Sequence, residues 1–162
     1  MKTPAVVIAL AGVAVVATLA GIAFNPFAPG TTEHALRPDD PKFLVAGGRI
    51  YMAQCAACHG ARLEGQPEWR TRSADGLLPA PPHDASGHTW HHPDETLFRI
   101  TKFGVASIVG DTNYKTAMPV YEATLSDGDI IAVLSWIKAQ WPAAIREKHD
   151  QMNAETAKAS RP

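Results

Sequence analysis

Apolar and polar positions divide the chain into one long apolar run near its start and a region of shorter amphipathic segments. Residues 5–24 are apolar or small apart from Thr18, and no charged residue occurs from residue 3 to residue 32. Twenty residues of helix span about 30 Å, the thickness of the hydrocarbon core of a bilayer. We therefore expect residues 4–24 to form a single membrane-spanning helix, with the rest of the chain outside the cytoplasm.

A cleaved secretory signal is the alternative interpretation of residues 1–24. The apolar region of a signal peptide is usually ~7–15 residues long, shorter than this run. The run is rich in alanine rather than leucine, which weakens it as an anchor, and small residues near its end are compatible with cleavage. Under both interpretations we expect the later residues to face the periplasm, tethered to the inner membrane if the segment is retained.

Three later segments have the residue spacing of amphipathic helices. In the first of them, Phe43, Ala46 and Ile50 recur on one face. The last begins with Ser126-Asp127-Gly128-Asp129, which resembles a capping box with Ser126 as the N-cap. The predicted helices are residues 42–54, 93–103 and 127–140, and residues from Val105 to Met118 are expected to form a loop.

Proline-rich and polar stretches set the expected domain boundaries. Residues 25–41 contain four prolines and predict an extended linker. Residues 143–162 form a polar, alanine-rich tail that either prolongs a helix or frays, and we assign it no function. The expected domain is residues 42–142. The net charge of −1 provides no basic excess, so nucleic acid is not an expected partner.

The candidate chemistry is concentrated in Cys55-Ala56-Ala57-Cys58-His59, which contains both cysteines of the chain. The spacing C-x-x-C-H is the attachment signature of a c-type haem. Two thiols three positions apart each bond to one haem vinyl group as a thioether, and the adjacent imidazole becomes an axial iron ligand. Cys55 and Cys58 are therefore the candidate haem-binding residues, and His59 is the candidate axial ligand.

Other interpretations of the motif are less well supported by the surrounding sequence. A thioredoxin-like C-x-x-C needs a βαβ setting, and no strand-rich pattern surrounds this one. A zinc site needs two further ligands, and no other cysteine is present to supply them. A disulfide across two intervening residues closes almost no loop and adds little stability.

From residue 42 to residue 141 the chain resembles the class I c-type cytochromes, in a membrane-anchored bacterial form. Besides the haem motif, the resemblance rests on Gly47 and Tyr51, eight and four positions before Cys55, on Met118-Pro119, and on the capped last helix. It implies an all-α fold, a few helices around one covalently bound haem c. It also implies that the last helix crosses the first closely at Gly47.

The resemblance further implies that Met118 is the second axial ligand of the haem iron, opposite His59. A thioether is a soft ligand that suits ferrous iron, and His/Met ligation raises the reduction potential. Met52, Met152 and the histidines of the loop remain alternatives. The family also uses a proline carbonyl to accept a hydrogen bond from the proximal imidazole, and Pro81 and Pro82 are both candidates.

Four histidines in one loop are the least expected local feature of the sequence. A solvated loop, hydrogen bonding near the haem edge, and a copper or zinc site all remain open. The four residues are His83, His88, His91 and His92.

The resemblance implies electron transfer rather than enzymatic catalysis, because two protein ligands leave the iron no site for a substrate. The expected partners are a quinol-oxidising cytochrome complex and a terminal oxidase, or other respiratory or photosynthetic redox complexes. A haem subunit fixed in a larger oxidoreductase is a close variant. A haem sensor or peroxidase-like enzyme, with a labile sixth ligand, is the alternative function.

Overall fold

The computed structural model describes residues 33–111 and 113–160. These residues form helices joined by irregular segments, and no strand occurs among them, so the predicted all-α fold is confirmed. Within these described ranges, no helix is both long enough and apolar enough to cross a membrane. The predicted anchor, residues 4–24, lies outside the described part of the chain.

The haem motif ends a helical run that begins at α1 (Pro41–Ile50). Asp40 caps this helix by accepting a hydrogen bond from the backbone N–H of Lys42 at 2.9 Å. The run continues through a π-helical turn, η1 (Tyr51–Cys55), and a short α2 (Ala56–His59), so it extends beyond the predicted end at Gln54. Gly60 ends it because its φ of 82° lies in the region that favours glycine.

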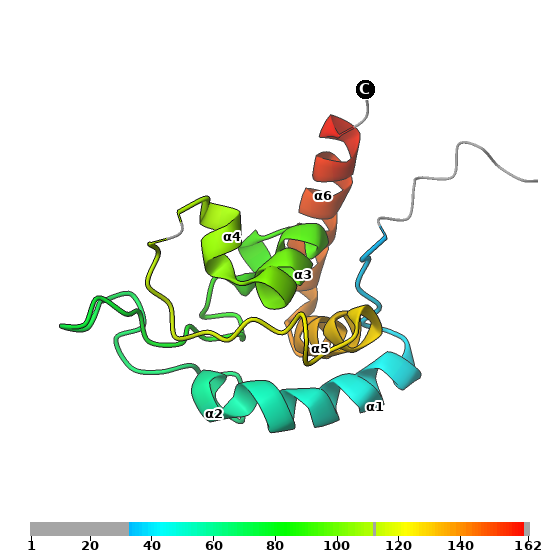
Figure 1. Cartoon of the computed structure of the whole chain (residues 1–162). Coiled ribbons are helices and arrows are strands. Elements are labelled where there is room, and N and C mark those ends of the chain that lie inside the picture. Colours follow the sequence, from blue (N-terminus) through cyan, green and yellow to red (C-terminus); the bar gives the residue numbers. More distant parts are fainter. Residues whose placement is uncertain (1–32, 112, 161–162) are drawn as a thin grey trace, which may run out of the picture.

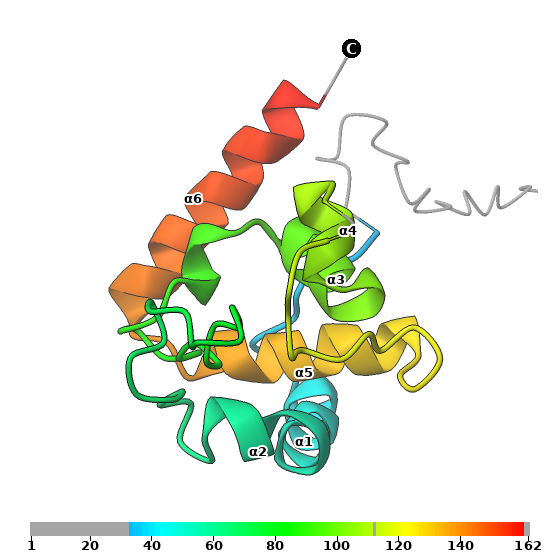
Figure 2. The ribbon, with the colours of Figure 1, turned by 60° about the vertical axis from the view of Figure 1, so that its left-hand side comes forward.

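The last predicted helix, α5 (Asp127–Ala139), crosses α1 and packs closely against it (Figures 1 and 2). Its capping box is present, with reciprocal bonds between Ser126 and Asp129. A Cβ atom placed on Gly47 would lie 2.1 Å from the carbonyl oxygen of Ala132, a separation that real atoms cannot adopt. The predicted close crossing at Gly47 is therefore confirmed.

Two helices follow the histidine-containing loop. Helix α3 (Asp94–Phe103) begins one residue later than predicted, because Pro93 is its N-cap. Helix α4 (Val105–Val109) lies where a loop was expected. It is a single turn that begins directly after Gly104, and such a short element produces no recognisable hydrophobic period.

The C-terminal tail folds as α6 (Ala143–Ala159) and packs beside η2 (Thr89–His91), with its far end projecting from the molecule (Figure 1). His149 is fully buried and donates from Nε2 to the carbonyl oxygen of His92 at 3.0 Å. Asn153 bonds through its side chain to both the backbone N–H and the carboxylate of Asp94. Polar contacts therefore hold α6 to the domain.

The segment before α1 also packs on the domain from residue 34 onward. Leu36 is buried, and its backbone N–H donates to Asp94 Oδ2 at 2.9 Å. The backbone N–H of Arg37 donates to Ser135 Oγ at 2.8 Å. This part of the predicted linker consequently belongs to the folded structure.

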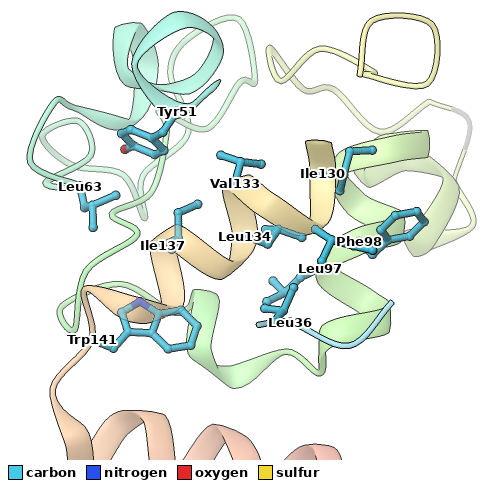
Figure 3. Close-up of a cluster of buried hydrophobic side chains, with 11 residues drawn as sticks. Leu36, Tyr51, Leu63, Leu97, Phe98, Ile130, Val133, Leu134, Ile137 and Trp141 are labelled. Carbon is cyan, nitrogen blue, oxygen red and sulfur yellow. The ribbon is translucent and has the colours of Figure 1, made fainter. Parts of the chain in front are cut away.

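A single apolar core lies between α1, α3 and α5, and α5 contributes more of its buried residues than any other element (Figure 3). In this view Tyr51, Leu63 and Trp141 lie on one side of the cluster and Phe98 lies on the other. The other labelled core residues are Leu36, Leu97, Ile130, Val133, Leu134 and Ile137.

Candidate functional site

The structure brings Cys55, Cys58 and His59 together at the end of the first helical run. Cys55 is the last residue of the π-helical turn, and the other two lie on α2. Cys55 is half-buried and Cys58 is exposed, and both are free thiols. Burial raises the pKa of the Cys55 thiol to about 11, with a smaller contribution from Cys58, so Cys55 stays protonated at neutral pH.

The imidazole of His59 is held by a backbone carbonyl. Its Nδ1 lies 2.9 Å from the carbonyl oxygen of Pro81 rather than that of Pro82. A carbonyl only accepts, so Nδ1 carries the proton and the neutral ring keeps its lone pair on Nε2. Burial lowers the pKa of His59, which the bond to Pro81 partly opposes, and the ring therefore stays neutral.

A closely packed turn places the Pro81 carbonyl beneath His59. Gln66 pairs with Ala80 through two bonds of 2.8 Å, one from its backbone N–H and one to its side-chain oxygen. A Cβ on Gly65 would lie 2.4 Å from the nitrogen of Pro82, so the two arms of the turn touch only because this residue is glycine. The carbonyl therefore has a fixed position relative to the ring of His59.

His83 lies directly beside His59, a position that its place in the sequence did not reveal. Its ring stacks on that of His59, with centroids 4.0 Å apart and planes at 20°. Its Nδ1 lies 2.8 Å from Thr89 Oγ1, and its carbonyl accepts a 2.7 Å bond from the indole of Trp141. Burial, and then electrostatic repulsion from the neighbouring His59 and His88, lower the pKa of His83 well below its usual value, so it is neutral.

The other three loop histidines pack on aromatic rings instead of forming a metal centre. His88 stacks on Trp69 and meets His92 edge-on, while His91 stacks on Trp90. In the described part of the chain, no group of three or more histidine, cysteine or acidic side chains could hold a metal ion. The copper or zinc interpretation therefore finds no site among these residues.

Met118 lies in the irregular segment between α4 and α5, where it is half-buried. Its backbone N–H donates to Thr116 Oγ1 at 3.1 Å. Tyr121, three residues later, is buried, and its hydroxyl donates to the carbonyl oxygen of Gln54 at 2.8 Å. The segment that carries Met118 is thus bonded to the residue directly before Cys55.

The decisive comparison concerns the whole stretch that contains these residues. Residues 44–137 match the family model described as cytochrome c oxidase, cbb3-type, subunit III. The chain belongs to this family of c-type cytochromes. Comparisons with curated proteins and with solved structures found no match to the chain.

The site of this cytochrome suits the haem that the family binds. Two thiols at the required spacing adjoin a neutral histidine whose Nε2, among the described residues, has no hydrogen-bond partner and is available to iron.

Sequence reasoning did not indicate Tyr121, and it offered His83 only as one of four loop histidines for which bonding near the haem edge remained open. The ring of His83 was read with the loop histidines, because sequence position does not reveal which ring turns inward. Tyr121 carried a usable signal, an aromatic residue between Met118-Pro119 and the capped helix, which suggests an anchoring side chain.

Proposed function

We propose that this cytochrome is a membrane-tethered, periplasm-facing electron carrier with one covalently bound haem c. The observation that carries the proposal is the bond from His59 Nδ1 to the Pro81 carbonyl. It fixes the tautomer and orientation of the ring and leaves Nε2 without a proton, as a histidine that ligates iron requires.

Cys55 and Cys58 would hold the haem through thioethers, and His59 and Met118 would occupy its two axial positions. Bound haem supplies a reversible one-electron change at iron. The protein supplies the ligands, excludes water through its buried core, and with two axial side chains leaves no position for a substrate. This arrangement supports electron transfer rather than bond chemistry.

The apolar residues 4–24 support a tether to the inner membrane, and the family description supports a place near a terminal oxidase. We propose that electrons arrive from a quinol-oxidising cytochrome complex and leave to a terminal oxidase. The cytochrome acts either as a tethered carrier or as a fixed subunit. A tethered carrier needs only a small, transient interface with each partner.

The proposal is tested with the full-length haem-loaded protein, solubilised from membranes in detergent. The oxidised protein is expected to show a sulfur-to-iron charge-transfer band, and the reduced protein is expected to bind carbon monoxide slowly. Met118→Leu should abolish the band and open the iron to carbon monoxide. Met52→Leu and Met152→Leu are the matched controls and should leave both properties unchanged.

Other outcomes would assign a different function. Rapid carbon monoxide binding by the unmodified protein, with no charge-transfer band, would overturn the Met118 assignment and favour a sensor or peroxidase-like enzyme. Release of the haem protein from membranes by alkaline carbonate would contradict the tether. Haem that persists on a denaturing gel after Cys55→Ser and Cys58→Ser together would contradict thioether attachment.

A further inference from the structure

The segment from residue 113 to residue 121 is attached to the rest of the molecule on both sides of Met118. On the C-terminal side the attachment is Tyr121, through its hydroxyl bond to Gln54 and a 3.3 Å bond from its N–H to the carbonyl oxygen of Thr101. Both partners lie on the helical framework, so this end of the segment is fixed close to the haem motif.

On the N-terminal side the segment is attached to the long loop that follows the haem motif. The guanidinium carbon of Arg72 lies 5.3 Å from the ring centroid of Tyr114. Lys115 Nζ donates to the carbonyl oxygen of Asp75 at 3.1 Å. Figure 1 shows both loops on the side of the molecule away from α6. We call these two contacts the cross-loop latch.

Hydrogen bonds within its own loop hold the side chain of Arg72 in place. Arg72 Nη1 donates to the carbonyl oxygen of Gly76 at 2.6 Å, which closes the turn over which the side chain passes. Gly76 has a φ of 80°, and Ser73 bonds through backbone and side chain to Leu77. The guanidinium group is therefore fixed both by its own loop and by its contact with the ring of Tyr114.

We propose that the cross-loop latch positions Met118 for iron ligation, so that Arg72, Tyr114 and Lys115 are positioning residues of the sixth-ligand side. The inference rests on the proposed axial role of Met118. Movement of its segment would withdraw the thioether from the iron, and the latch restricts that movement at the end that Tyr121 does not hold. Local turns within the segment, such as the bond from Met118 N–H to Thr116 Oγ1, do not connect it to the framework.

The chain offers a matched control in the same loop. Arg70 also lies over an aromatic ring, that of Trp69, at 4.1 Å from the ring centroid, but this pair lies within one loop. Removing Arg70 thus deletes a cation and a cation–π contact without releasing the Met118 segment. Arg72→Ala differs from Arg70→Ala in the contact to Tyr114 and in the bond that closes its own turn.

The test uses the full-length haem-loaded protein. Carbon monoxide binding by the reduced protein reports how often Met118 leaves, and hydrogen exchange of backbone amides 113–118 reports opening of the segment directly. Arg72→Ala and Tyr114→Leu should each accelerate both processes by about two- to fivefold, the effect of losing an exposed cation–π contact. Arg70→Ala and Tyr114→Phe should match the unmodified protein.

The double variant Arg72→Ala/Tyr114→Leu should be no faster than Arg72→Ala alone, because Arg72→Ala already removes the contact to Tyr114 together with the bond to Gly76. Additive effects, or rates in Arg72→Ala and Tyr114→Leu no faster than in Arg70→Ala, would overturn the latch while leaving the electron-transfer function intact. If the unmodified protein lacked the sulfur-to-iron band, Met118 would not be an iron ligand. That result would overturn both the proposed axial role of Met118 and the cross-loop latch.

Discussion

At the scale of single residues, Gly47 determines how closely the haem-motif helix approaches α5. The hydrogen on its α-carbon faces the backbone of Ala132, and a Cβ there would also lie 2.8 Å from the Cβ of Trp136. Neither neighbour is a flexible side-chain end, so the clash can be relieved only by separating two helices. The helices then lose contacts along their whole crossing.

We therefore expect Gly47→Ala to lower the free energy of unfolding by about 3 kcal/mol, the upper end of overpacking costs. Gly128→Ala is the matched control, because its Cβ would meet only Ser126 Oγ at 3.8 Å. That substitution should be neutral or slightly stabilising. Guanidinium unfolding of the haem-loaded protein measures both, and equal midpoints for the two variants would contradict the close-crossing explanation.

Residues that belong to a recognisable sequence motif could be predicted. Residues that reach the site only because of the path of a loop could not. The capping box at Ser126 follows from a local pattern, the close crossing at Gly47 was implied by the resemblance to the c-type cytochromes, and both are present. Pro81 and Pro82 are neighbours with the same side chain, so only the loop geometry shows that Pro81 accepts from His59. The stacking of His83 on the same ring depends on that geometry too.

At the scale of elements, α6 shows how a helix can dock without an apolar stripe. His149 is its buried residue, and its partners are polar: the His92 carbonyl through Nε2 and the Asn153 amide through Nδ1. Lys138 of α5, which is also buried, forms a 2.6 Å ion pair with Asp150 of α6. Hydrophobic periodicity cannot detect such contacts, which is why the sequence left the tail unassigned.

The burial of His149 makes the stability of the cytochrome depend on pH. Burial, and then Lys138, lower the pKa of His149, and Asp94, the His92 carbonyl and Asp150 oppose this without reversing it. Between the lowered value and about 6.5 the unfolded chain binds more protons, so stability falls as the pH falls below about 6.5.

The measurement is guanidinium unfolding between pH 7.5 and pH 5.5, with His149→Gln as the comparison. The unmodified protein should lose more stability over this interval than His149→Gln, because the variant lacks the titrating group. Other histidines contribute equally to both proteins and cancel in the difference. Parallel pH profiles would contradict the assignment of this dependence to His149.

At the scale of the whole molecule, the first and last described segments are part of one fold. Leu36 joins the apolar core ahead of α1, although the prolines around it predicted an extended linker. A lone apolar residue in such a stretch has no period to reveal its burial, and the backbone bond to Asp94 that accompanies it is a long-range contact.

Leu36→Ala should therefore destabilise the full-length cytochrome by about 2 kcal/mol, the low end of the range for buried leucine. Val45→Ala, on the exposed face of α1 where Val45 is 65% accessible, is the control and should change stability by less than about 0.5 kcal/mol. Denaturant midpoints compare the two. If Leu36→Ala were as mild as Val45→Ala, the segment before α1 would be a linker after all.

The attachment of Leu36 and Arg37 has a mechanical consequence. If residues 4–24 hold the protein at a membrane, a pulling force would enter the domain at His34, Leu36 and Arg37, before it reaches α1. The Asp94 carboxylate accepts from Leu36 N–H through Oδ2 and from Asn153 through Oδ1, and Ser135 accepts from Arg37 N–H. Such a load would be divided among α3, α5 and α6 before it reached the helical run that bears Cys55, Cys58 and His59.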